Sequence, residues 1–260
     1  MDNALWLAGI LTEAGVVSLL LFRHVWRNLP VFVIFLIASL LGDLSGRLIL
    51  AFRPGAYTDA YLVIAVADSI LEICVLIELA WSVLLPIRRS LPRGALLVIS
   101  LLVLIAAGVI WPFAGIGDTS GMTGVVAHIV RVQQTSSILR IVFFLALTGL
   151  SQLLSMGWRD REIQVATGLG FYSLVSLSAT LLHSQGASQA HYGNLMRIVA
   201  ASYLCSMIYW VVSFAQKEAE RRQFTPQMQS FLLALAGSAR SQRVALANAK
   251  DGKRPGRKQP

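Results

Sequence analysis

The sequence predicts an all-α membrane protein: a seven-transmembrane-helix bundle with its N-terminus outside and its C-terminus in the cytoplasm. Only 13% of the 260 residues are charged and 56% are hydrophobic, whereas about a quarter of the residues in a soluble domain are charged. Seven apolar stretches each have about the 20 residues that a helix needs to cross a hydrocarbon core. They cover residues 4–22, 30–51, 60–85, 94–113, 138–156, 163–183 and 196–215.

Lysine and arginine residues between these stretches predict the orientation. Alternate connections are basic, and they hold Arg23 and Arg27, then Arg88, Arg89 and Arg93, then Arg159 and Arg161, then the ten Lys/Arg of the tail after Gln216. On the other side, Arg53 follows the second stretch, and the segments 114–122 and 184–194 hold no lysine or arginine. Because basic connections stay in the cytoplasm, the N-terminus is expected outside.

The first two stretches have clear flanks. The first, 4–22, is preceded by Asp2 and has its basic flank behind it, so we expect a retained membrane helix and not a cleaved secretory signal. Pro30 opens the second stretch, and Pro54 with Gly55 follows it. Both prolines indicate helix ends, because proline interrupts a helix anywhere but in its first turn.

The remaining stretches are bounded in the same way, except the fifth. Pro86 ends the third, and Pro112 marks the outer end of the fourth. Helical character begins near Thr123, ahead of the fifth stretch, and a helix over 123–156 would be about 50 Å long, which exceeds the hydrocarbon thickness. A helical extension, a break and a re-entrant piece all remain open for residues 123–137. In the sixth, Ala166 and Gly170 predict a close helix contact.

Two regions are expected: a membrane domain over 1–216 and a basic cytoplasmic tail over 217–260. Thr225-Pro226 predicts the start of a short amphipathic helix over 226–247, followed by a disordered end. The tail holds ten Lys/Arg and three acids, so it supplies 10 − 3 = +7 of the net charge of +9. We therefore interpret the charge as a topology signal and a contact for anionic lipid headgroups, not for nucleic acid.

Ionisable residues inside the apolar stretches are the candidate site. Each costs about 2.5 to 3.5 kcal/mol at mid-membrane, so it is expected to be paired, hydrated or functional. Counting from the stretch ends places most of them in the outer half, where a shared polar pocket is predicted. The set is Glu13, Asp43, Arg47, Asp68, Glu72, Glu78, Arg140 and Arg197.

Helical spacing predicts which of these groups meet. Asp43 and Arg47 are four residues apart and are expected to pair on one face. Asp68 and Glu72 have the same spacing but like charge, so they need a cation from another helix; Arg140 is the best candidate by depth and Arg197 the next. Glu78 lies about 100° around the helix from these two acids, near the membrane centre, and is expected to make a different contact.

A polar stripe is predicted on the fifth helix. Gln133, Ser136, Ser137 and Arg140 share one face and are expected to face the bundle, whereas His128 and Arg131 lie nearly opposite Arg140 and should contact water, headgroups or outer loops.

Catalytic motifs are not found. The four histidines include no HExxH motif and no pair four residues apart, and the last stretch has no lysine for a retinal Schiff base. We therefore predict no enzyme, no catalytic residue, no metal site and no cofactor. Structural ion pairs between helices, a ligand-binding or ion-coupled site, and catalysis remain the three interpretations of the charged set, the last being the weakest.

Some segments resemble a known family. They are Tyr61-Leu62, Asp68, Ile77-Glu78-Leu79, Arg131, Leu139-Arg140, Leu150-Ser151, Gly157-Trp158-Arg159 and Gly168-Leu169-Gly170-Phe171. Over roughly residues 5–215 the chain resembles an uncharacterised polytopic membrane family seen mainly in acidobacteria. The resemblance implies a compact multi-span helical bundle and carries no activity.

Together these features predict a multi-pass protein of the bacterial inner membrane that senses or binds a small ligand through an outer polar pocket. The alternatives are an ion-coupled secondary transporter, with Asp68, Glu72 or Glu78 carrying protons, and a structural or assembly subunit of a membrane complex. Expected partners are the lipid bilayer and anionic headgroups at the tail, and a membrane or cytoplasmic protein partner remains open.

Overall fold

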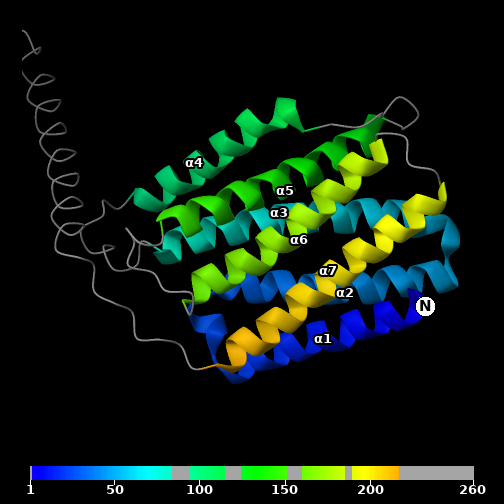
Figure 1. Cartoon of the computed structure of the whole chain (residues 1–260), viewed down its shortest axis with the longest axis horizontal. Helices are drawn as coiled ribbons and strands as arrows, with labels where there is room; N and C mark the ends of the chain where they lie inside the picture. Colours follow the sequence, from blue (N-terminus) through cyan, green and yellow to red (C-terminus); the bar gives the residue numbers. More distant parts are fainter. Residues whose placement is uncertain (1, 84–93, 115–123, 151–159, 185–188, 217–260) are drawn as a thin grey trace, which may run out of the picture.

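The computed structural model describes residues 2–83, 94–114, 124–150, 160–184 and 189–216. Seven α-helices and three short 3-10 turns make up most of this part of the chain (Figure 1). The helices are α1 (Asp2–Phe22), α2 (Pro30–Phe52), α3 (Tyr57–Val83), α4 (Ala95–Ile110), α5 (Gly124–Leu150), α6 (Arg161–Ser184) and α7 (Gln189–Ala215), and the turns are η1 (Val25–Arg27), η2 (Pro54–Ala56) and η4 (Trp111–Phe113). All seven have stretches long and apolar enough to cross a membrane, which confirms the predicted seven-helix bundle.

Six of the seven predicted stretches match the observed helices closely, but the fifth is displaced. Its apolar window begins at Ala127 and not at 138, and α5 is a continuous helix from Gly124, so a helical extension is correct. Residues 151–156 of the predicted stretch lie outside the described residues. The expected extent was wrong because the polar run from Gln133 to Ser137 faces other helices and not lipid. Counting from residue 138 places Arg140 within about two helical turns of the outer end of this helix, but in the structure it lies about four turns from Gly124.

Six helices form a closed ring, and the seventh lies outside it. Around the ring, α1 contacts α2, α2 contacts α3, α3 contacts α5, α5 contacts α6, α6 contacts α7, and α7 returns to α1. Among the described residues α4 packs against α3, α5 and its own continuation η4, and Figure 1 shows it along one edge of the bundle. Its 16 residues include no charged side chain and expose most of their leucines, as expected of a helix surrounded by lipid.

An apolar core fills one end of this ring. We call the end where α1 begins the outer end, after the predicted orientation, and the opposite end the inner end. Phe32, Trp210 and Phe214 are fully or almost fully buried at the inner end, and the ring of Phe32 lies 5.1 Å from that of Trp210 and 6.2 Å from that of Phe214. Nearby, Arg23 donates to the backbone oxygen of Ala215 at 2.6 Å and ties α1 to the end of α7.

Glycines in α6 allow its neighbours to come close. A Cβ on Gly168 would lie 2.4 Å from the indole nitrogen of Trp210, which itself donates to the backbone oxygen of Gln164 at 3.1 Å. A Cβ on Gly170 would lie 2.8 Å from the Cβ of Phe144. Together with the buried Ala166, this confirms the predicted close contact at the Ala166/Gly170 pair.

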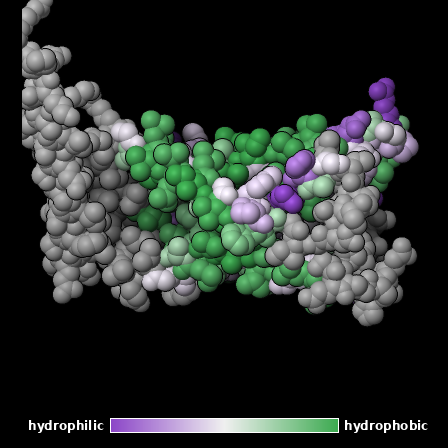
Figure 2. Space-filling model, turned by 90° about the horizontal axis from the view of Figure 1, so that it is seen from above, coloured by the Kyte–Doolittle hydropathy of each residue, from purple (hydrophilic) through white to green (hydrophobic). Residues whose placement is uncertain are grey.

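The outside of the bundle is largely apolar, as a multi-pass membrane protein requires. Figure 2 shows hydrophobic side chains over the middle of the molecule and hydrophilic ones toward the outer end. Cys74 and Cys205 are both free thiols, half-buried and exposed respectively. The predicted tail helix and disordered end lie outside the described residues.

Candidate functional site: a polar cluster inside the bundle

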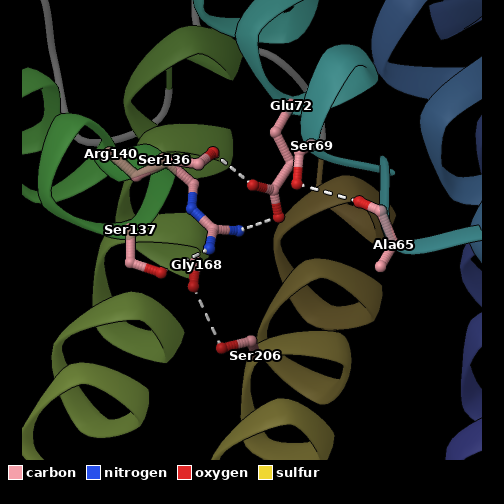
Figure 3. A network of polar contacts seen from close by, with 8 residues as sticks. All are labelled: Ala65, Ser69, Glu72, Ser136, Ser137, Arg140, Gly168 and Ser206. Carbon is pink, nitrogen blue, oxygen red and sulfur yellow. Dashed lines mark hydrogen bonds and ion pairs between the residues drawn. The ribbon is translucent and has the colours of Figure 1, made fainter. Parts of the chain in front are cut away.

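An ion pair between Glu72 and Arg140 links α3 to α5 in the bundle interior. The guanidinium Nη1 lies 2.5 Å from the Glu72 Oε1, and both residues are less than 10% exposed. The Ser136 hydroxyl donates to the other carboxylate oxygen, and Arg140 Nη2 donates to the Ser137 hydroxyl oxygen at 3.1 Å (Figure 3). The pairing predicted between this acid and this arginine is therefore confirmed.

The polar stripe on α5 is confirmed in the same contacts. Ser136, Ser137 and Arg140 are buried, and Gln133, one turn earlier, is half-buried. On the opposite face His128 is exposed, and the Arg131 guanidinium lies 5.9 Å from the centroid of the Trp111 ring.

Of two further predicted residues, Asp68 lies close to this ion pair and Arg197 lies apart from it. Asp68 is half-buried one turn before Glu72 and lies near both Glu72 and Arg140, so the three groups share one region. Arg197, the second candidate cation, is exposed on α7, and the Glu72 carboxylate is occupied by Arg140.

Glu78 caps a helix. Its two carboxylate oxygens accept hydrogen bonds from the backbone N–H groups of Val31 at 2.7 Å and Phe32 at 2.8 Å, in the first turn of α2. Those groups have no partner inside their own helix, and a carboxylate there also opposes the positive end of the helix dipole. The expected separate contact is confirmed, and it lies at the start of α2. The depth of Glu78 in the membrane stays a prediction.

A second set of polar groups lies between α1, α2 and α7. Glu13 is 0% exposed, and the hydroxyls of Ser39 and Tyr203 lie beside its carboxylate. The carboxyl groups of Asp43 and Asp68 act on Glu13 through space.

Two tyrosines join this second set to the ion pair. The ring of Tyr203 packs edge-on against that of Tyr172, with centroids 5.5 Å apart. The guanidinium of Arg140 lies 5.7 Å from the centroid of the Tyr172 ring. The polar groups therefore run without interruption from Glu72 on α3 to Glu13 on α1.

We call this set the polar cluster. Every helix of the ring contributes at least one member, whereas α4 contributes none. Four carboxyl groups share the cluster with one guanidinium group. The members are Glu13, Asp43, Asp68, Glu72, Arg140, Tyr172 and Tyr203.

Sequence reasoning did not identify Tyr172 and Tyr203. Tyrosines in membrane helices are enriched at the interfaces, where the hydroxyl meets water. Both of these tyrosines lie near the middle of their helices, where a hydroxyl needs a protein partner or a hydrated space. Their distance from the helix ends was therefore the signal that could have found them.

Exposure along α2 shows how the interior changes from the inner to the outer end. Phe32, Leu36, Asp43, Arg47 and Leu50 follow one another at helical spacing on the same face. Phe32 and Leu36 are 0% exposed, whereas Asp43 and Arg47 are exposed and Leu50 is 44% exposed. The face that is sealed at the inner end is therefore accessible in the outer half.

Helix α7 shows the same change. Phe214 and Trp210 are almost fully buried near its inner end, and Met196, on the same face near the outer end, is 47% exposed. On the exposed outer part of α2, the Arg47 guanidinium lies 4.6 Å from the centroid of the Trp6 ring and joins α1 to α2. The predicted pairing of Asp43 with Arg47 stays a prediction.

Comparisons of the chain with protein-family models, characterised proteins and solved structures find no match. The resemblance to the acidobacterial family stays a prediction. In the described part of the chain, no three His, Cys, Asp or Glu residues are grouped so as to hold a metal ion.

Proposed function

We propose that this protein binds a small polar ligand in the polar cluster, admits it from the outer end, and serves as a sensor of that ligand in the bacterial inner membrane. The observation that carries this proposal is the exposure of the interior face of α2 at Asp43 and Arg47, directly outside the buried acids. A site reached from outside and closed at its inner end suits binding without passage.

The balance of charge in the cluster supports binding over a purely structural role. Helices joined by ion pairs need matched charges, because an uncompensated buried charge is strongly destabilising. Arg140 compensates Glu72, but Glu13 and Asp68 bring further carboxyl groups to the same region. Carboxyl groups in excess of the cations are expected where a ligand supplies the missing partner.

Ion-coupled transport is the second candidate, favoured by the same carboxyl groups near the middle of the membrane. Transport requires that the site also open to the inner side. The buried Phe32, Trp210 and Phe214 close that side here. Inner access in any state of the protein would therefore favour a transporter over a sensor.

Cysteine labelling tests the proposed outer access. In full-length protein whose Cys74 and Cys205 are replaced by alanine, D43C should react with a membrane-impermeant thiosulfonate added on the outer side of membrane vesicles. L41C is a matched control, because Leu41 is two residues away and exposed on the lipid-facing side of α2. A thiol in lipid does not ionise and should not react, and neither should L36C in the sealed core.

Equal reactivity at positions 41 and 43, or none at either, would contradict the proposal, since the interior would then not differ from the lipid-facing surface. Labelling of D43C from the inner side under an imposed ion gradient would favour transport.

A further inference from the structure

Glu13 differs from the other glutamates inside the bundle in what its carboxylate meets. The Glu72 carboxylate accepts from Ser136 and Arg140, the buried Glu162 accepts from Ser82, and the half-buried Glu78 accepts from two backbone N–H groups. In the described part of the chain, no donor meets either oxygen of Glu13 at hydrogen-bonding geometry, although the residue is 0% exposed.

Such a group is costly to leave unmatched. A buried polar atom without a hydrogen bond costs about 1–3 kcal/mol, and more if the group is charged. The buried hydroxyl of Tyr203 lies beside Glu13 and Ser39, and it too has no well-aligned hydrogen bond to a described residue. Two neighbouring buried polar groups thus lie beside each other in the polar cluster, and neither has a well-aligned hydrogen bond to a described residue.

The charges around Glu13 indicate what would occupy that place. The charged groups that act on Glu13 through space are Asp43 and Asp68, both acids, and Arg140 is already paired with Glu72. An anion would be repelled there. A divalent metal would need several protein ligands, and the described residues provide no such group. A cation that carries its own N–H donors meets both conditions.

We infer that the ligand of the polar cluster carries an ammonium or guanidinium group, bound by the Glu13 carboxylate with the hydroxyls of Ser39 and Tyr203. This inference rests on the proposed function and adds the chemical class of the ligand. An ammonium group offers three donors, enough for both oxygens of Glu13 and the oxygen of Tyr203. The Tyr172 and Tyr203 rings beside the site add a surface that favours an organic cation.

Thermal unfolding of the full-length protein in lipid nanodiscs tests the ligand class. The probes are methylammonium, guanidinium and 1,4-diaminobutane, compared with 1,4-butanediol as a neutral analogue and succinate as an anionic one, at fixed pH and ionic strength. At least one cationic probe should raise the melting temperature, whereas the diol and succinate should not. Sodium and potassium chlorides are included to separate an organic from an inorganic cation.

Glu13→Gln should weaken the binding of the stabilising probe about ten-fold or more, because it removes the charge that accepts the hydrogen bonds. Asp59→Asn is the matched control, since Asp59 is an exposed acid in the first turn of α3, and it should leave binding unchanged. Tyr203→Phe removes a single hydroxyl and should weaken binding several-fold. It provides the same test if Glu13→Gln fails to fold.

Three results would overturn the inference: no stabilisation by any of the three cations, equal stabilisation by the diol, or a sodium or potassium effect that Glu13→Gln abolishes. Failure of this inference can be distinguished from failure of the proposed function. If D43C labels from the outer side while no amine binds, the ligand class is wrong and outer access stands. If D43C does not label, the proposed function itself fails.

Discussion

Single side chains in this bundle carry contacts that involve two or three helices each. Arg140 compensates the charge of Glu72, bonds Ser137 and lies over the ring of Tyr172. The cluster therefore depends on one guanidinium group, and replacing it should have effects that a surface arginine does not have.

Arg140→Ala should lower the stability of the protein in detergent by about 3–5 kcal/mol, the usual cost of removing one partner of a buried ion pair. Arg53→Ala, at an exposed arginine between α2 and η2, is the control and should have little effect. Unfolding of both variants by heat and denaturant measures the difference, and equal melting temperatures would count against the network. The double variant Glu72→Leu/Arg140→Met should recover part of the loss, because it leaves no unpaired charge.

Gly168→Ala should destabilise the inner core. The added methyl group would meet the Trp210 indole at 2.4 Å and displace the ring from its hydrogen bond to Gln164. Overpacking of this kind costs about 1–3 kcal/mol. Gly149→Ala is the matched control, because nothing lies within 4 Å of the position of its added Cβ. The tryptophan emission spectrum and the melting temperature should both change in Gly168→Ala, and neither should change in Gly149→Ala.

Helices meet through contacts that no single helix reveals. The first turn of α2 contains Pro30, which has no N–H, and its next two N–H groups are bound by Glu78 of α3. The partner of this acid could not be predicted, since a backbone N–H on another helix leaves no mark in the sequence.

Glu78→Gln should destabilise the protein by about 1–3 kcal/mol, because it replaces hydrogen bonds to a charged group by weaker ones and removes the charge at the helix end. Hydrogen exchange at Val31 and Phe32, followed by mass spectrometry, should accelerate relative to the rest of α2. Asp59→Asn removes an exposed acid from the same helix α3 and should change neither quantity. Unaltered exchange at Val31 and Phe32 in Glu78→Gln would show that the cap is dispensable.

The number and length of the helices could be predicted because a membrane requires long apolar segments whose backbone groups bond internally. The same rule placed the start of the fifth stretch too late, because the polar residues from Gln133 to Ser137 were excluded from the membrane helix although they face other helices. Glu72 and Arg140 were predicted to pair because two nearby acids require a cation. The order of helices around the ring depends on the shapes of packed side chains and could not be predicted.

At the scale of the whole molecule, the outer and inner halves differ in exposure. The inner half holds the buried apolar core together with buried polar residues such as Ser82 and Glu162, whereas polar side chains with exposed neighbours occupy the middle and outer half. The orientation of these halves in the membrane follows from the arginine count alone and stays a prediction.

Reporter fusions test that orientation. A reporter fused after Lys217 should be active as a cytoplasmic marker, and one inserted at Gly186 as a periplasmic marker, because the basic connections are expected inside. Both reporters on the same side would mean that the number of membrane crossings is not seven.

The position of α4 outside the ring has a consequence for how the chain is routed. Helices α3 and α5 are neighbours and run in the same direction, from the outer to the inner end, so the chain must return across the membrane between them. Helix α4 is that return path, as the crossover helix is between two parallel strands. Apart from Val103, which is buried with Leu76 and Leu139, its side chains need only to be apolar and sufficient in number. A generic leucine–alanine helix that keeps Val103 in place of Ala95–Ile110 should therefore preserve both the fold and ligand binding, whereas the same exchange in any ring helix should abolish them.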